Sequence, residues 1–77
     1  MNKDRRKRIL TAWHLLDEAD EILSQVLGEE EEALENMPEG LQNGERAERM
    51  QEYIDTLGDV SDKLQEIKDD LDGVADG

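Results

Sequence analysis

The sequence has no cysteine and no phenylalanine, and it has a single proline, histidine, tryptophan and tyrosine among 77 residues. The absence of cysteine excludes disulfide bridges and thiolate zinc sites, and it fits a cytoplasmic protein better than a small secreted one. One histidine leaves no histidine pair for a metal site. No apolar run approaches the length of a membrane span, so we expect no insertion into a membrane.

The sequence also lacks the patterns that carry catalysis. It contains no nucleophile beside a general base and no glycine-rich phosphate loop. Carboxylates are abundant, but a small helical protein offers no deep and dry pocket in which their pKa values would shift. We therefore expect a non-enzymatic protein with no catalytic residue, no bound metal and no cofactor.

Basic residues are few and unevenly placed. The chain has 22 acidic and 9 basic residues and a net charge of −13. Residues 1–8 carry five bases and one acid, which gives this segment +4 and leaves −17 for the remainder. Phosphate backbones repel so acidic a protein, so we expect no direct binding to DNA.

A strict 3.5-residue period organises residues 50–74. Apolar residues there follow one another in alternating steps of three and four, which is the period of a coiled-coil seam. The intervening positions are mostly acidic or polar, so this helix is predicted to press one narrow stripe against another helix. The stripe consists of Met50, Leu57, Leu64 and Leu71 at the a positions of the heptad, and of Tyr53, Val60, Ile67 and Val74 at the d positions.

A broader apolar stripe lies in the first half of the chain. Its width is typical of a bundle helix that contacts more than one neighbour. Asn2 or Asp4 can cap the start of this helix, and Gly28 interrupts it at a cost of about 1 kcal/mol. The stripe consists of Ile9, Ala12, Trp13, Leu16, Ala19, Leu23, Val26 and Leu27, is widened by Leu10, Leu15 and Ile22, and resumes at Ala33, Leu34 and Met37.

Pro38 and the Asn43-Gly44 pair mark a short connection between the two helices, in which a short helical turn is expected. Short connections between long helices give antiparallel neighbours. The sequence therefore predicts a single all-α domain over residues 1–77, an antiparallel two-helix hairpin with a helix at about 3–36, a turn at 37–44 and a helix at about 44–72. Because two helices cannot cover the broad stripe, we expect a homo-oligomer, a dimer or higher, forming a helical bundle.

The exposed acids form the first candidate site. Charges outside a seam commonly keep a coiled coil in solution. They can also replace the phosphates of a nucleic acid and occupy a basic groove on another protein. In helices, Glu45 and Arg49, and Asp59 and Lys63, are expected to pair one turn apart. The candidate protein-binding residues are Glu29, Glu30, Glu31, Glu32, Glu35, Glu48, Glu52, Asp55, Asp59 and Asp62.

The basic N-terminus forms the second candidate site, with two interpretations. In an antiparallel hairpin the N-terminal arginines lie beside the C-terminal aspartates Asp69, Asp70, Asp72 and Asp76, and pairing between them would fix the alignment of the helices. Alternatively, a cluster repeated between subunits forms an anion pocket, with arginines that clamp phosphate and an indole that stacks on a base. The residues of this pocket are Arg5, Arg6, Arg8 and Trp13.

The connection carries a resemblance. Asn36-Met37-Pro38-Glu39-Gly40-Leu41-Gln42, followed by Glu45-Arg46 and an acidic heptad helix, resembles a group of small acidic proteins encoded by phages and integrated mobile elements of Gram-positive bacteria. Gly40 and Gly44 stand where that group often has serine. The resemblance implies a cytoplasmic protein of the bacterial host and carries over no functional residue.

Three functions remain open at this point. The first is a phage or mobile-element inhibitor that sequesters a host (defence) protein through its acidic surface. The second is a sponge for a nucleotide or cyclic dinucleotide messenger, which would use the arginine and tryptophan pocket. The third is a structural coiled-coil spacer that needs neither surface.

Overall fold

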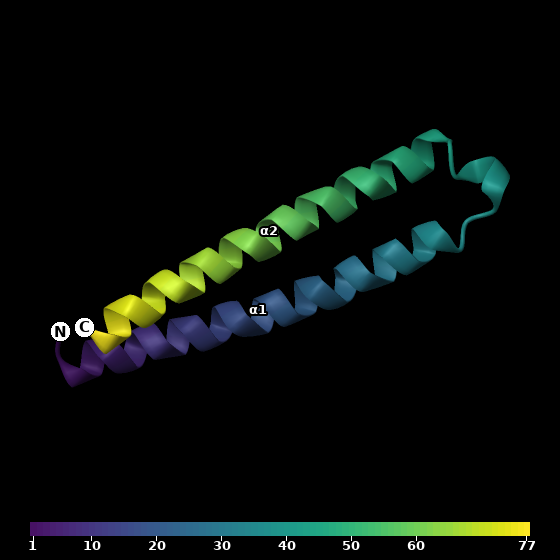
Figure 1. Cartoon of the computed structure of the whole chain (residues 1–77). Helices are drawn as coiled ribbons and strands as arrows, with labels where there is room; N and C mark the ends of the chain where they lie inside the picture. Colours follow the sequence, from purple (N-terminus) through teal and green to yellow (C-terminus); the bar gives the residue numbers. More distant parts are fainter.

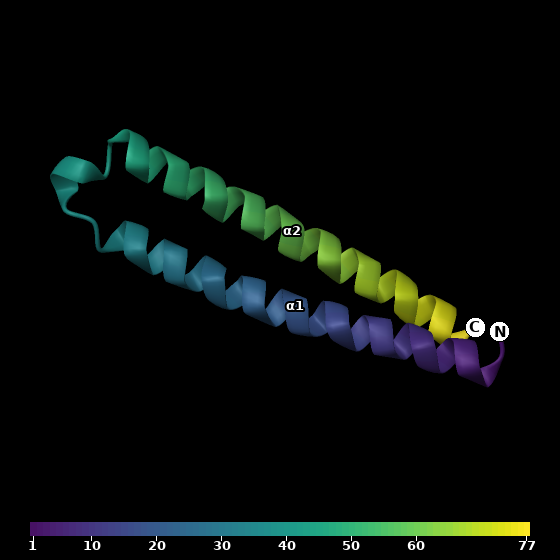
Figure 2. The same cartoon turned by 180° about the vertical axis from the view of Figure 1, so that it is seen from behind.

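The computed structural model describes residues 1–77 and is a helical hairpin (Figure 1). It contains α1 (Lys3–Glu35), a short 3-10 helix η1 (Glu39–Leu41) and α2 (Glu45–Asp76). The two long helices run antiparallel and side by side, with both chain termini at one end and the connection at the other, as the reverse view also shows (Figure 2). The hairpin measures 59 × 14 × 13 Å between Cα extremes. The predicted all-α antiparallel hairpin is confirmed.

Helix α1 begins and ends at recognisable caps. The side-chain oxygen of Asn2 accepts a hydrogen bond of 2.8 Å from the backbone N–H of Arg5, which satisfies one of the free donors at the helix start. The helix continues through Gly28, which is exposed and where an added Cβ would meet no atom within 4 Å. Its last residue is Glu35, and the C-cap is Asn36, two residues before Pro38. The backbone N–H of Asn36 donates to the carbonyl of Glu32 at 3.0 Å. The prediction of one continuous first helix is confirmed.

The connection is held by its own hydrogen bonds. In η1, the N–H of Leu41 donates to the carbonyl of Pro38 at 2.8 Å, and the side-chain amide of Gln42 donates to the carbonyl of Met37 at 3.0 Å. Gly44 precedes α2 and brings no side-chain cap to it. The expected short helical turn between the long helices is present.

Helix α2 extends beyond the end expected near residue 72. It passes through Gly73 to Asp76, and the N–H of Gly77 donates to the carbonyl of Gly73 at 3.2 Å. A glycine inside a helix costs at most about 1 kcal/mol relative to alanine. Leu71 and Ala75, on either side of Gly73, remain half-buried against α1, and this packing keeps the last turn helical.

The seam of α2 differs from the predicted one at every second position. The predicted a positions do face α1, but the predicted d positions lie to one side of the contact, and Tyr53, Ile67 and Val74 are exposed. In the contact, each predicted d position is replaced by the residue that directly follows it in the sequence. The observed seam is Ala47, Met50, Ile54, Leu57, Ser61, Leu64, Lys68, Leu71 and Ala75.

The seam of α1 follows the same alternation of three and four. It leaves out several apolar residues of the predicted broad stripe, which stay on the surface, and it includes one aspartate in the middle. The shielded residues at seam spacing are Arg6, Ile9, Trp13, Leu16, Asp20, Leu23, Leu27, Glu30, Leu34 and Met37. The polar Asp20 requires polar partners on α2, and Ser61 and Lys68 supply them. This requirement explains the shifted seam.

The core between the two helices is thin. Only Ala47, Met50 and Lys68 are buried, and no side chain is completely enclosed. A chain of this size rarely gains more than about 3–5 kcal/mol from its own core. The exposed apolar residues therefore form a surface that a partner or a further copy of the chain can cover.

Neither long helix contains a stretch apolar enough to cross a lipid bilayer.

Candidate functional site

A buried lysine joins the two helices near the terminal half of the hairpin. Lys68 is 5% exposed, and its Nζ donates hydrogen bonds to Asp17 Oδ1 at 3.0 Å and to Asp20 Oδ2 at 3.1 Å. The hydroxyl of Ser61 donates to the other oxygen of Asp20 at 2.8 Å. We call these four residues, Asp17, Asp20, Ser61 and Lys68, the Lys68 cluster. It contains the only ion pairs between α1 and α2.

The contacts of the cluster stabilise the charged forms of Asp20 and Lys68. The hydrogen bond from Ser61, followed by the one from Lys68, lowers the pKa of Asp20 below its ordinary value. Hydrogen bonds to Asp17 and then to Asp20 raise the pKa of Lys68 above its ordinary value. Desolvation opposes both shifts and is the weaker influence. Asp20 and Lys68 therefore stay charged and paired across neutral pH.

The sequence contained a signal for this cluster that the apolar pattern concealed. Lys68 lies between Leu64 and Leu71 at seam spacing, and Asp20 lies between Leu16 and Leu23 in the same way. Opposite charges at interrupting positions of two stripes predict a pair across the seam. Counting apolar residues on each helix alone passes over such a pair, and we missed both residues for that reason.

The predicted N-terminal pocket is only partly assembled within one chain. Arg5 and Arg8 line an open groove with Met1, Ile9, Ala12 and Leu71. Trp13 is absent from this groove. Its ring is half-buried in the seam, with His14 edge-on at 5.2 Å between ring centres and Lys68 Nζ 5.6 Å from the centre of the indole.

Arg6 also faces the seam. Its Nε atom and the Nε1 atom of Trp13 are enclosed and have no hydrogen-bond partner. The structure therefore brings Arg5 and Arg8 together and places Arg6 and Trp13 in the contact between the helices.

Pairing between the basic N-terminus and the C-terminal aspartates does not occur. The only ion pair of the N-terminal arginines joins Arg8 Nε to Asp4 within α1, at 3.2 Å and fully on the surface. Asp69, Asp70, Asp72 and Asp76 form no ion pair. Exposed charges gain little from pairing because water screens them and the long side chains lose freedom. The alignment of the helices is fixed by the Lys68 cluster instead.

Acidic residues form a continuous line along the outer side of α2. They follow one another in steps of three and four from the start of the helix to its end, interrupted only at Gly73, and all are exposed. The line is about 46 Å long, with one carboxylate about every 5 Å. We call it the acidic ridge, and it comprises Glu45, Glu48, Glu52, Asp55, Asp59, Asp62, Glu66, Asp69 and Asp76.

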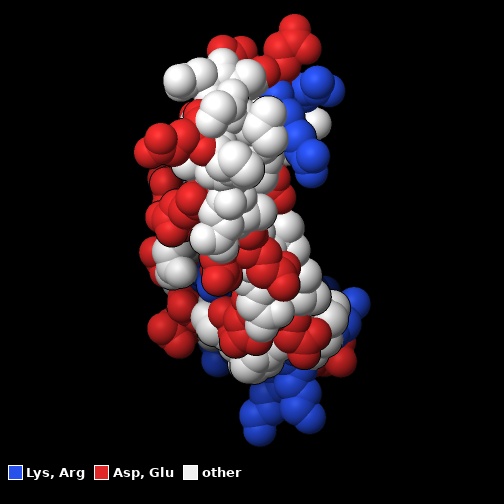
Figure 3. All heavy atoms as spheres, turned by 90° about the vertical axis from the view of Figure 1, so that its right-hand side faces the viewer, with Lys and Arg blue, Asp and Glu red and all other residues white.

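No lysine or arginine pairs with any residue of the acidic ridge. The expected pairs Glu45 with Arg49 and Asp59 with Lys63 are not formed, so that prediction was wrong. The only side chains that donate to the ridge are two glutamines, Gln51 to Asp55 and Gln65 to Asp69, each at 3.0 Å. Figure 3 shows acidic side chains spread along the molecule, with Lys and Arg gathered mainly at its opposite ends.

The acidic run on α1 is divided among several directions. Glu31 and Glu35 lie on the side of Gln51 of α2 and line an open groove with it. Glu30 lies on the seam line and is half-shielded, while Glu29 and Glu32 are exposed. Of the predicted protein-binding residues, the five on α2 thus belong to one surface, whereas the five on α1 do not form a single cluster.

One side of the hairpin is apolar. Val26 and Ala33 of α1 and Tyr53 of α2 line neighbouring grooves on this side, and helical spacing of seven residues extends both lines along the hairpin. Leu15 and Ile22 lie beside the line on α1 and are 61% and 60% exposed. We call this surface the apolar face. It comprises Ala12, Leu15, Ala19, Ile22, Val26 and Ala33 of α1 and Tyr53, Val60, Ile67 and Val74 of α2.

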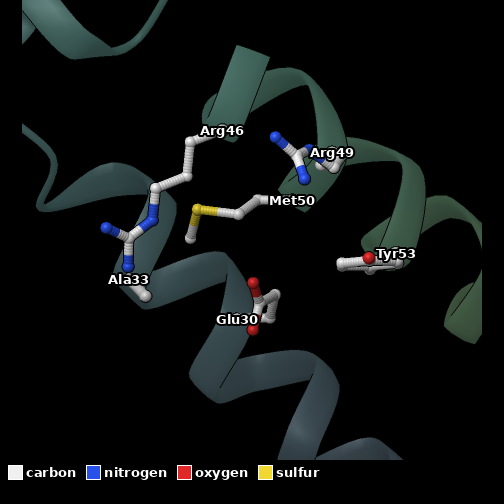
Figure 4. A pocket seen from close by; sticks show the side chains of 6 residues that line it. All are labelled: Glu30, Ala33, Arg46, Arg49, Met50 and Tyr53. Carbon is white, nitrogen blue, oxygen red and sulfur yellow. The ribbon is translucent and has the colours of Figure 1, made fainter. Parts of the chain in front are cut away.

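The loop end of the apolar face carries charged side chains. Figure 4 shows Arg46, Arg49, Met50 and Tyr53 of α2 around a groove whose other wall is Glu30 and Ala33 of α1. Met50 points between the helices, and Arg46 extends across toward α1. Glu30 forms no ion pair with either arginine. Both guanidinium groups therefore remain available to a partner.

Comparisons with known protein families, with curated proteins and with solved structures find no match to this chain. No group of three or more histidine, aspartate or glutamate side chains is placed to hold a metal ion. The features of the hairpin that bear on function are therefore two surfaces, the acidic ridge and the apolar face, and the buried Lys68 cluster between the helices.

Proposed function

We propose that the hairpin is a non-enzymatic binding protein that occupies a basic, nucleic-acid-binding surface of a host protein through its acidic ridge. The observation that carries this proposal is the line of nine carboxylates on α2 without a single cationic partner. One strand of DNA presents a phosphate every 3.4 Å of helix axis, and the ridge presents a carboxylate about every 5 Å. A rigid helix thus offers a polyanion of lower charge density than DNA.

The distribution of charge supports a binding role over simple solubility. A surface designed only to stay in solution mixes both signs, whereas the ridge concentrates one sign on one side of one helix. Like charges one turn apart destabilise a helix by about 0.2–0.5 kcal/mol per pair. The ridge therefore weakens its own helix, which solubility alone does not require.

The partner would be a host protein, as the resemblance to phage and mobile-element proteins implies, and the complex would act by excluding nucleic acid. Glu31 and Glu35 of α1 stand on the side of Gln51 at the loop end and would extend the contact. The alternative of a nucleotide sponge gains no support from a specific contact, because Trp13 lies under Lys68 and apart from Arg5 and Arg8.

The test uses the fraction of host-cell proteins that binds to immobilised DNA. Immobilised wild-type protein should capture a member of this fraction, release it as salt is raised, and lose it to added DNA, because exposed charge attraction is screened by ions. The ridge variant Glu52→Gln/Asp55→Asn/Asp59→Asn should capture much less.

The matched control is Glu21→Gln/Glu39→Gln/Asp72→Asn, which removes the same charge from exposed positions outside the ridge. This variant should bind as the wild type does. Equal binding of the two variants, or capture that neither salt nor DNA reverses, would rule out the proposal.

A further inference from the structure

We propose that the apolar face binds a second copy of this chain in parallel, with the loops of the two hairpins at the same end. In this arrangement α1 of each copy packs against α2 of the other, and the four helices form a bundle. The proposal concerns the apolar face alone and does not depend on the function of the acidic ridge.

The size of the apolar face fits a dimer. The hairpin measures 59 by 14 Å across this side, an area of about 800 Å², which is what one partner contributes to a standard interface. The opposite side is polar, because Glu31, Glu35 and Gln51 line its groove. A contact with one partner on this side therefore covers six of the nine large exposed apolar residues, all but Met1, Leu10 and Leu41.

The register of the hairpin sets the height of each residue along its axis. Grooves pair Val26 with Leu57, Ala33 with Met50 and Ala12 with Leu71, and each pair of numbers adds to 83. Arg49 therefore stands at the height of residue 34, and Lys63 stands at the height of residue 20. Asp70 stands at the height of residue 13.

The two outer edges of the apolar face carry opposite charges in matching order. Arg49, Lys63 and Asp70 each precede an apolar-face residue of α2 by four positions, so they line its outer edge. By the same rule, the outer edge of α1 carries, in the same order from the loop, Glu29, Glu18 and Arg8, each of which precedes an apolar-face residue of α1 by four positions. In the second match the heights differ by two residues, about 3 Å, and in the first and third by five, about 8 Å.

This complementarity is the property that a symmetric interface needs, since both copies contribute the same surface. In the parallel arrangement the edge of α2 meets the edge of α1 of the other copy, and each of the three matches occurs twice. In the antiparallel arrangement each helix would meet its own copy. Lys63, near the middle of the hairpin, would then face Lys63 of the second copy, which is repulsive.

The orientation can be measured directly because the chain has no cysteine. A spin label on Asn43→Cys, in the loop, should give an intermolecular distance below about 30 Å, since neighbouring helices of a bundle are 8–10 Å apart. A label on Gln25→Cys, near the middle, gives a short distance for either orientation and verifies that dimers are present. A loop-to-loop distance near the full 59 Å length would overturn the proposal.

A matched pair of variants tests which face is covered. Ile67 on the apolar face and Leu10 outside it are 45% and 44% exposed in the single chain. Ile67→Gln should weaken the dimer by at least about tenfold in Kd, because two buried side chains are lost per dimer. Leu10→Gln should leave the Kd unchanged. A monomer at micromolar concentration, or equal effects of both substitutions, would contradict the proposal.

A charge exchange provides an independent test of the edges. Lys63→Glu should weaken the dimer, because it places a carboxylate against Glu18 of the second copy. Adding Glu18→Lys should restore the affinity in the parallel dimer. Failure of the second substitution to rescue the first would show that these edges do not meet.

Discussion

Lys68 lies over the indole ring of Trp13, with Nζ 5.6 Å from the ring centre, while the same atom contacts Asp17 and Asp20 on the same helix. A cation over the face of tryptophan is attracted by the negative charge of the ring face. One lysine of α2 is thus held by three residues within two turns of α1. A slip of α2 along α1 by one turn would break all of these contacts together.

The first prediction concerns the removal of one partner from the Lys68 cluster. Lys68→Ala should lower the melting temperature by on the order of 10 °C, because the half-buried Asp20 keeps its charge and loses its cation. The triple variant Lys68→Leu/Asp20→Leu/Ser61→Ala should recover the stability or exceed it, since apolar residues pack well in a seam. Thermal unfolding followed by circular dichroism at one protein concentration measures both. A triple variant less stable than Lys68→Ala would show that the loss in Lys68→Ala does not come from the unpaired charge of Asp20.

The second prediction is a loss of stability in acid that depends on Asp20. Because its contacts lower the pKa of Asp20 below the ordinary 3.8, the folded state favours the carboxylate. Its contribution is complete above pH 3.8 and disappears as pH falls through the lower pKa of the folded state. The difference in unfolding free energy between wild type and Asp20→Asn should be constant between about pH 5 and 8 and shrink below about pH 4. A difference that grows in acid would show that the carboxylate is not the stabilising form.

The raised pKa of Lys68 has the opposite dependence on pH. Its contribution is complete below the ordinary value of 10.5 and is lost only as pH rises through the higher pKa of the folded protein. The wild type should therefore show no loss of this contribution between about pH 5 and 9.

The third prediction uses the weak point of α1. Gly28→Ala should raise the free energy of unfolding by about 1 kcal/mol, because alanine restricts the unfolded chain and favours the helix. The added Cβ meets no atom within 4 Å. Gly44→Ala is the control. The Cβ of an alanine at position 44 would lie 3.4 Å from the carbonyl oxygen of Leu41. Residue 44 is also the N-cap of α2, where alanine is less favourable than glycine. Chemical denaturation should find Gly28→Ala stabilised and Gly44→Ala not.

The fourth prediction is that salt stabilises the hairpin. The acidic ridge repels itself, and ions screen that repulsion over about 10 Å at 0.1 M. The melting temperature should therefore rise with salt. The ridge variant Glu52→Gln/Asp55→Asn/Asp59→Asn should be more stable than wild type at low salt and respond less to added salt. The control Glu21→Gln/Glu39→Gln/Asp72→Asn should change less, and an equal change would assign the effect to net charge alone.

The helices and their antiparallel arrangement could be predicted because period and turn chemistry are local. The steps of three and four between apolar residues predicted α2, and Pro38 with Gly44 marked the connection. Five residues of the acidic ridge were also among the predicted protein-binding residues. The absence of ion pairs along the ridge could not be predicted, because pairing depends on side-chain geometry.

The contact between the helices could not be predicted from either helix alone. Met50, Leu57, Leu64 and Leu71 belong to two possible seams, one completed by Tyr53 and the other by Ile54 and Lys68. A count of apolar residues selects the first seam, because the residues that complete it are all apolar, whereas Ser61 and Lys68 are among those that complete the second. The structure selects the second because Asp20 needs a cation, and that requirement lies on the other helix.

Both termini of the hairpin lie at the same end, opposite the loop. In a parallel pair of hairpins all four chain ends would therefore meet. A short flexible linker from Gly77 of one copy to Met1 of the next should then join two copies into one polypeptide without disturbing the bundle. In the reverse orientation the same linker would have to span most of the 59 Å length. Whether a short linker leaves the bundle intact therefore distinguishes a parallel from an antiparallel pair of hairpins.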